Sequence, residues 1–309
     1  MDSNSAKSKI IIICGPTGIG KTSVGIHLAE KFGGEIIGAD SMQIYRHMDI
    51  GTAKPTPDER RRVFHHMVDI VDPDEDFDAV KFSVEARKTI AALNSQGHPA
   101  FVVGGTGLYI KALLHGLFQS EPVDPEVRSR LRHELEQGGS RCLYERLEQI
   151  DPDTAGRLHP NDSYRILRAL ETFETSGESI AKRHQSHGFE DNPFNALKIG
   201  LRIDRMKLYA RIERRVDLMI QAGLVEEVKK LLAMGYSAEL KSMQSIGYRH
   251  MVEFLTASMP WEECVRTLKR DTRRFAKRQF TWFGADPHIQ WYEPDQLNEI
   301  ARLVEGFLE

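Results

Sequence analysis

The feature that most constrains the fold lies near the start of the chain, where residues 11–22 read IIICGPTGIGKT. The apolar run is typical of a buried strand, and the glycines after it break the strand into a tight loop. This loop matches the pattern G-x-x-x-x-G-K-[ST], in which backbone N–H groups and the start of the next helix surround a phosphate. The sequence therefore predicts a strand, a phosphate-binding loop and a helix in succession.

Two side chains at the end of this loop have specific chemical uses. Lys21 contributes a positive charge beside phosphate oxygens, and the Thr22 hydroxyl is a natural ligand for Mg²⁺. We therefore expect Mg²⁺ as a cofactor, with Thr22 as its ligand. The expected phosphate-binding residues are Gly15, Pro16, Thr17, Gly18, Ile19, Gly20, Lys21 and Thr22. The loop alone does not identify the phosphate compound.

Apolar strands and amphipathic helices alternate through the first hundred residues. Strands are predicted at residues 9–14, 35–38, 66–71 and 99–103, and helices at 21–32 and 80–96. This alternation is typical of a parallel sheet flanked by helices, so we expect an α/β, P-loop NTPase-like fold. In open sheets of this kind, ligands bind beyond the C-terminal strand ends. Three of these ends carry GPTGIGKT, ADSMQIY and GGTGLY, which we expect to line one pocket.

The pattern changes after about residue 116. The residues that follow contain helical stretches and many charges but no convincing strand, until 198–203 again read as a strand. We expect residues 1–116 and 196–309 to form the core domain, and residues 117–195 to form an all-helical insertion.

Composition and charge exclude several classes of protein. The formal net charge of −3 at pH 7 argues against a globally basic nucleic-acid coat, so an RNA site would be a local patch. The three cysteines form no C-x-x-C pair, which argues against a zinc site or a disulfide framework. No run approaches the roughly 20 apolar residues of a membrane span. We expect a cytoplasmic, monomeric protein with no obligate protein partner.

Positive charge gathers in two predicted helices of the C-terminal half. In the helix at 204–222, we expect at least one of Arg211, Arg214 and Arg215 to reach the phosphate. The helix at 260–283 is strongly basic, and two interpretations stay open: a solvated helix face, or contact with a polyanion. Its basic residues are Arg266, Lys269, Arg270, Arg273, Arg274, Lys277 and Arg278.

The expected pocket also contains groups suited to proton transfer. A P-loop protein that cleaves ATP usually has a strand ending in an Asp that holds Mg²⁺, whereas the strand at 99–103 ends in GGTGLY without an acid. Asp40 follows another strand, where its carboxylate is placed as a general base. Two other roles stay open for Asp40: it could cap the N-terminus of a helix, or it could bind a water molecule of the metal ion. Thr106 is placed to donate to a phosphate oxygen or to form a tight turn.

Six segments in order carry a resemblance to a known family. They are GPTGIGKT, ADSMQIYRHMDIGTAKP, VVGGTGLYIKALL, HPNDSYRILRALE, SIGYRHM and AKRQFTWF. Together they closely resemble the bacterial tRNA dimethylallyltransferases, also called IPP transferases, from residue 10 to about 284. The resemblance implies transfer of a dimethylallyl group from dimethylallyl diphosphate to N6 of adenosine 37, beside the tRNA anticodon, with release of diphosphate.

The resemblance also implies roles for individual residues. It implies that Asp40 is the general base, that Thr106 contacts diphosphate and substrate, and that Arg215 binds diphosphate. It implies contacts with the anticodon stem-loop of tRNA, for which the adenine must be extruded from its loop. The implied tRNA-binding residues are Asp40, Ser41, Met42, Gln43, Thr106, Arg128, Tyr164, Arg165, Ile166, Leu167, Arg168, Gln244, Ser245, Ile246, Gly247, Tyr248 and Arg249.

Three other functions stay open at this point. A related enzyme would prenylate a free adenine nucleotide, but a mononucleotide needs neither the insertion nor the basic helix. A small-molecule kinase would use the loop for ATP. An RNA-binding regulator would carry an inactive loop, and substitution of Asp40 would leave its behaviour unchanged.

Overall fold

The computed structural model describes residues 7–117, 124–179 and 193–309, which form two compact units. One unit combines Met1–Leu114 with Pro193–Glu309, and the other is His115–Asn192. The sequence places the end of the insertion at residue 195, whereas a strand of the first unit already begins at Phe194. Each unit has its own hydrophobic core.

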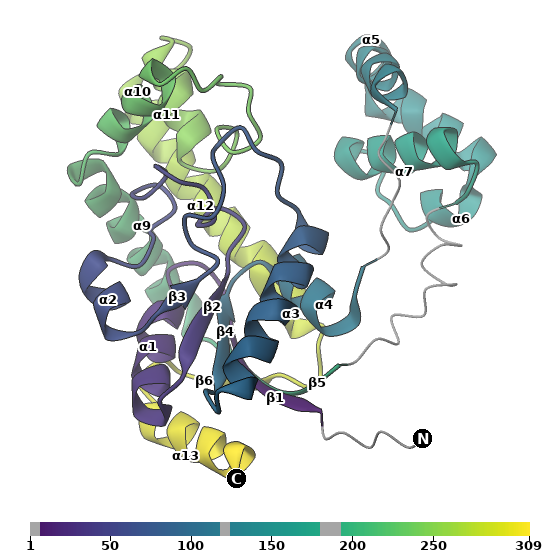
Figure 1. Cartoon of the computed structure of the whole chain (residues 1–309). Helices are drawn as coiled ribbons and strands as arrows, with labels where there is room; N and C mark the ends of the chain where they lie inside the picture. Colours follow the sequence, from purple (N-terminus) through teal and green to yellow (C-terminus); the bar gives the residue numbers. More distant parts are fainter. Residues whose placement is uncertain (1–6, 118–123, 180–192) are drawn as a thin grey trace, which may run out of the picture. The chain divides into compact units, whose positions relative to one another are not determined.

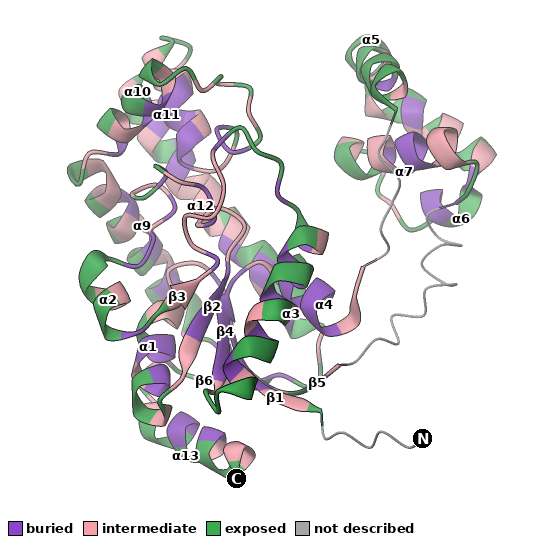
Figure 2. Cartoon of the chain, viewed as in Figure 1, coloured by how far each residue is buried: buried purple, intermediate pink, exposed green. Residues whose placement is uncertain are grey.

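The first unit is built on six parallel strands in the order β3-β2-β4-β1-β5-β6 (Figure 1). Its α/β fold with a parallel sheet is therefore the one that the sequence predicts. The central strands are continuous apolar runs because helices cover both faces, and Figure 2 shows them buried. The strands are β1 (Ser8–Cys14), β2 (Glu35–Ala39), β3 (His65–His66), β4 (Ala100–Gly104), β5 (Phe194–Leu201) and β6 (Gln290–Tyr292).

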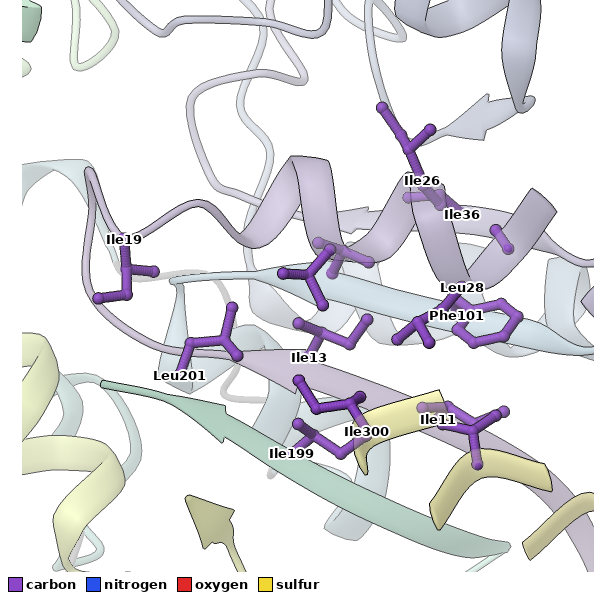
Figure 3. Packing of buried hydrophobic residues seen from close by; sticks show 14 of the residues in the cluster. Ile11, Ile13, Ile19, Ile26, Leu28, Ile36, Phe101, Ile199, Leu201 and Ile300 are labelled. Atoms are coloured by element: carbon purple, nitrogen blue, oxygen red, sulfur yellow. The ribbon is translucent and has the colours of Figure 1, made fainter. Parts of the chain in front are cut away.

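Several helices of this unit pack their apolar stripes against the sheet. On one face, Ile11 and Ile13 of β1 pack with Leu28 of α1 and Ile300 of α13 (Figure 3). The helix α3 contacts β1 and β4. The helices are α1 (Lys21–Phe32), α2 (Pro57–Arg62), α3 (Ala79–Ser95), α4 (Gly107–His115), α9 (Arg205–Gln221), α10 (Leu224–Ala233), α11 (Tyr248–Leu255), α12 (Trp261–Gly284) and α13 (Leu297–Leu308).

The second unit is helical in the part that the structure describes. It contains α5 (Pro125–Ile150), α6 (Pro152–Ala155) and α7 (Ser163–Ser176). Each helix begins after an aspartate whose carboxylate accepts a hydrogen bond from a backbone N–H group. α5 is interrupted at Gly139, whose φ of 70° and ψ of 177° are not helical. The core of this unit includes Leu131, Leu143, Leu147, Ile166 and Leu170.

Several elements differ from the sequence prediction. The strand predicted at 66–71 is wrong, because β3 ends at His66 and Met67 and Asp69 have φ values of 61° and 58°. α2 is not among the helices predicted from sequence, and it begins at the capping box formed by Thr56 and Glu59. Four further elements, α4, α11, β6 and α13, are absent from the sequence prediction. Among the described residues, no helix is long and apolar enough to cross a membrane.

Candidate active site

A pocket of about 390 Å³ lies at the C-terminal ends of β1, β2 and β4. Three of its walls come from the phosphate-binding loop, from the segment after β2 and from the end of β4. α2 contributes Glu59, and α9 and α12 supply the rest, through Arg211, Arg214, Arg215 and Leu218, and through Phe275 and Gln279. The strand ends that the sequence predicts to converge therefore do so.

The phosphate-binding loop is shaped by glycines and leaves backbone N–H groups free to bind a ligand. Gly15 has a φ of 145°, and a Cβ atom there would lie 2.8 Å from the Leu201 carbonyl oxygen of β5, so only glycine fits. Gly20, with a φ of 105°, caps α1 without any side-chain hydrogen bond. The first N–H groups of α1 are therefore available to an anion at the pocket.

Lys21 carries the positive charge of this loop. Its Nζ atom donates a hydrogen bond to the Pro16 carbonyl oxygen at 2.8 Å, which folds the side chain back over the loop. Burial lowers the pKa of Lys21 to about 8; the charge of Asp40 opposes this shift and that of Arg215 adds to it. A bound anion would compensate this partly desolvated ammonium group.

Asp40 and Thr106 lie together because their strands are paired, with Ala39 of β2 opposite Gly104 of β4. The Oδ1 atom of Asp40 accepts a hydrogen bond from the Met42 N–H at 2.9 Å. Within the described residues, Oδ2 makes no hydrogen bond, which leaves it free to accept one from a ligand. The Thr106 hydroxyl oxygen accepts the Ser41 N–H at 3.0 Å, which joins the two strand ends.

Three arginines extend from one face of α9 into the pocket. Arg211, Arg214 and Arg215 are spaced i, i+3 and i+4, so they share that face, and all three line the pocket. Arg215 is half-buried, and burial lowers the pKa of its guanidinium while the charge of Asp40 opposes the shift. Arg211 donates a hydrogen bond to the Ile19 carbonyl oxygen at 3.4 Å.

Gln279 of α12 lines the pocket and is buried, although it is absent from the residues predicted from sequence. Its side chain bonds to Thr17 in the phosphate-binding loop and to Gly105 after β4. One signal was available: residue 279 follows Phe275 by four positions, so a glutamine lies on the apolar stripe of the predicted helix. Nothing in the sequence indicates which segments it contacts.

The segment 244–249 contains both exposed and buried residues. Gln244 is exposed, and Arg249 pairs with Asp271 at 2.6 Å. Tyr248 is fully buried, and its hydroxyl donates to the Glu227 carboxylate at 2.6 Å. The same carboxylate accepts the backbone N–H groups of residues 49–51. The Tyr248 side chain therefore anchors the segment after β2 and is not accessible to an RNA.

In the helical unit, some of the residues that the resemblance implies to bind tRNA are exposed and others are buried. Tyr164 is 76% exposed, and Arg165 is exposed beside it at the start of α7. Ile166 is buried in the core of this unit, with Leu167 packed against that core. Arg128 pairs with Glu171 at 3.2 Å. The accessible groups for a partner of α7 are therefore Tyr164 and Arg165.

Many basic residues of α12 are already paired with acids. Lys269 contacts Asp217 of α9 at 2.6 Å, and Arg273 pairs with Glu213 of the same helix. Lys277 and Arg278 are exposed and form no ion pair with any residue that the structure describes. The ion pairs favour a solvated face for the part of α12 up to Arg273, and contact with a polyanion stays a prediction for the C-terminal end, where the unpaired charge lies.

Few side chains among the described residues could serve as ligands of a metal ion. The described residues contain no group of three or more His, Cys, Asp or Glu side chains able to hold one. Thr22 and Asp40 both line the pocket. The Thr22 hydroxyl, completed by phosphate oxygens and water, forms a donor set that suits Mg²⁺.

Comparisons with known proteins agree on one family. Residues 43–286 match the family model described as IPP transferase. A tRNA dimethylallyltransferase from Desulfosudis oleivorans is 54% identical over 98% of this chain and 96% of its own. The crystal structure of a tRNA isopentenylpyrophosphate transferase from Bacillus halodurans matches with a TM-score of 0.73 and 39% identity, over 98% of this chain and 97% of the other. A eukaryotic dimethylallyltransferase crystallised acting on tRNA matches with a TM-score of 0.73 and 31% identity, over 89% of this chain and 69% of its own.

Proposed function

The chain belongs to the IPP transferase family, and from this premise we propose how its pocket carries out the reaction of that family. It has tRNA dimethylallyltransferase activity and prenylates adenosine 37 of tRNA. The observation that carries the proposal for its site is that Asp40 lines the same pocket as Lys21 and Arg215. A carboxylate and a cationic phosphate-binding loop in one pocket suit alkyl transfer with a diphosphate leaving group.

In our proposal, the phosphate-binding loop holds the diphosphate of dimethylallyl diphosphate. Lys21, Arg215 and the free N–H groups at the start of α1 stabilise the negative charge that develops as the C1–O bond breaks. The adenine N6 atom forms the new bond to C1 from the opposite side. The half-buried position of Lys21 and Arg215 at the pocket wall supports this assignment, because both can reach a bound anion.

Asp40 is the proposed general base. Its Oδ2 atom accepts the proton that N6 loses, while Oδ1 stays bonded to the Met42 N–H and keeps the carboxylate in place. Thr106 has its hydroxyl oxygen bonded to the Ser41 N–H, and its own O–H can donate to Ser41 Oγ, at 3.4 Å, or to a diphosphate oxygen. Thr106 is proposed to contact diphosphate and substrate from this position.

Mg²⁺ is the proposed cofactor, with the Thr22 hydroxyl as its protein ligand. The scarcity of protein donors among the described residues means that the diphosphate oxygens and water would complete its coordination. When bound, the ion neutralises charge on the departing diphosphate.

We propose that the tRNA is bound through its anticodon stem-loop, with the adenine extruded into the pocket. Gln43 lines the pocket and donates to the carbonyl oxygens of Thr52 and Ala53, so it holds the segment that would face the base. Tyr164 and Arg165 of the insertion are the proposed contacts for unpaired nucleotides, because stacking and charge suit them. We further propose that the enzyme acts as a monomer in the cytoplasm, where tRNA is available.

Replacing Asp40 tests the proposed base. We expect Asp40→Asn to lower kcat by roughly 10²–10⁴-fold while tRNA affinity stays within a factor of about two, since the amide keeps the shape but cannot accept the proton. Mass spectrometry of nucleosides, after incubation with dimethylallyl diphosphate, Mg²⁺ and an anticodon stem-loop, measures the turnover.

The matched control is Asp74→Asn, an exposed aspartate outside the pocket, which should leave turnover unchanged. Equal turnover by Asp40→Asn and wild type would refute the base assignment. Prenylation of AMP as fast as of the stem-loop would instead favour a free-nucleotide enzyme, and phosphoryl transfer from ATP would favour a kinase.

A further inference from the structure

We infer that Gln279 is a positioning residue that fixes the diphosphate-binding loop against the turn that carries Thr106. This inference rests on the proposed function and deepens it. Gln279 lies on α12, in the last third of the chain, and reaches two loops that follow β1 and β4. No other described side chain hydrogen-bonds to both loops.

The hydrogen bonds of Gln279 define its orientation. The Thr17 N–H can only donate, so it must face Oε1, which accepts it at 2.8 Å. The Gly105 carbonyl can only accept, so it must face Nε2, which donates to it at 2.9 Å. An amide is the side-chain group that offers one acceptor and one donor at this spacing. The two partners therefore require glutamine rather than glutamate at this position.

The Gln279 side chain is closely surrounded by the loops that it joins. The side chain is buried, at 7% exposure, between the two loops. A Cβ atom built on Gly105 would lie 2.3 Å from Nε2, and also 3.4 Å from the Nζ atom of Lys21. The Gln279 amide and the Lys21 ammonium therefore both lie close against the Gly105 backbone, and their positions are set together.

The bonds of Gln279 continue to the proposed base. Gly105 is followed by Thr106, whose hydroxyl oxygen accepts the Ser41 N–H, and Ser41 is preceded by Asp40. A single path of bonds thus runs from the phosphate-binding loop through Gln279 to the segment of the base. Because alkyl transfer needs the leaving group and the nucleophile aligned, a shift between these loops would slow the reaction.

The deciding variant is Gln279→Glu, which keeps the shape and the acceptor but loses the donor when its carboxyl group is ionised. We expect kcat to fall by about 10²-fold, the fall that a displacement of about 1 Å can cause, and KM for dimethylallyl diphosphate to rise. The affinity for the anticodon stem-loop should change by less than about twofold, since no contact with tRNA is assigned to this amide and separate sites act independently. Gln279→Met, which keeps the length without either hydrogen bond, should lose kcat similarly.

The pH dependence of kcat distinguishes a positioning role of Gln279 from a merely structural one. When the carboxyl group introduced by Gln279→Glu is protonated, its O–H group can donate to the Gly105 oxygen as the amide does. The ratio of variant to wild-type kcat should therefore rise as pH falls, whereas the ratio for Gln279→Met should stay constant. Gln290→Glu, which replaces an exposed glutamine of β6, is the matched control and should behave as wild type.

Calorimetry that measures the affinity for inorganic diphosphate in the presence of Mg²⁺ separates this inference from the proposed function. If the wild-type protein does not bind diphosphate, the assignment of the phosphate-binding loop fails. If the wild type binds diphosphate but Gln279→Glu matches it in binding, kcat and pH profile, the inference about Gln279 is overturned. If both variants lose kcat with a constant ratio across pH, the donor to Gly105 is not the cause and the inference also fails.

Discussion

At the scale of single residues, Lys21 shows a conflict between stability and function. Its ammonium group is partly desolvated, so its pKa falls from 10.5 to about 8 on folding. A lowered folded-state pKa means that the unfolded chain binds more protons between these two values, so stability rises with pH in that window. Below pH 8, the full cost of the buried charge is present. In the proposed function, the diphosphate ligand compensates this charge, which accounts for a lysine at this position.

We therefore expect Lys21→Met to raise the free energy of unfolding of the ligand-free protein at pH 7, by about 1–3 kcal/mol, and to abolish diphosphate binding. The gain should shrink as pH rises from 8 toward 10.5, as the wild-type ammonium loses its proton. Urea unfolding at pH 7 and pH 9.5 measures it, with the exposed Lys241→Met as control. A gain of equal size at both pH values would contradict this explanation.

Whether a site residue could be predicted from the sequence depends on whether it lies within a short local motif. Asp40 and Thr106 lie at strand ends within short motifs, so their approach to Lys21 follows from the parallel sheet. Gln279 could not be found in this way, because its partners Thr17 and Gly105 are far away in sequence and no local pattern relates them. Tyr248 fits a family motif, yet its burial depends on the tertiary contact with Glu227.

At the scale of elements, strands and helices with strong periodicity follow the sequence prediction. The four isoleucines of β1 indicate a buried strand, and the N-cap aspartates of α5 and α7 indicate helix starts. The structure contains these elements at those positions. β3 and β6 are two and three residues long, and their existence depends on neighbouring strands rather than on their own sequence. Periodicity over such short segments carries too little information to predict them.

The exposed, unpaired charge that the structure describes on α12 lies near its C-terminal end, at Lys277 and Arg278. We expect the double variant Lys277→Ala, Arg278→Ala to weaken tRNA binding and to reduce the slope of log affinity against log salt by about one to two, since each residue neutralises about one phosphate. Fluorescence anisotropy with labelled tRNA, over a series of KCl concentrations, measures the slope. Arg266→Ala removes a residue already paired with Glu263 and should change it little. Equal slopes for the double variant and wild type would leave this end of α12 a solvated surface.

At the scale of the whole molecule, the proposed contacts with dimethylallyl diphosphate lie in one unit, whereas the proposed contacts with tRNA lie in both. The pocket belongs to the unit with the sheet, whereas Tyr164 and Arg165 belong to the helical unit. We expect Tyr164→Ala with Arg165→Ala to lower tRNA affinity by roughly tenfold, through lost stacking and charge, while diphosphate binding stays unchanged. Calorimetry with each ligand separately measures both, and Arg141→Ala, exposed and paired with Glu145, is the control. A loss of diphosphate binding in the double variant would contradict this division.

The order of strands in the sheet also affects how the enzyme is made on the ribosome. β1 is complete by residue 14, but its neighbour β5 ends only at residue 201, and α12 follows later still. A nascent chain therefore carries its phosphate-binding loop long before α9 and α12 exist to close the pocket. A chain that has not yet reached α12 lacks Gln279, which joins the loops after β1 and β4, so we expect each new molecule to become active only when its translation is nearly finished.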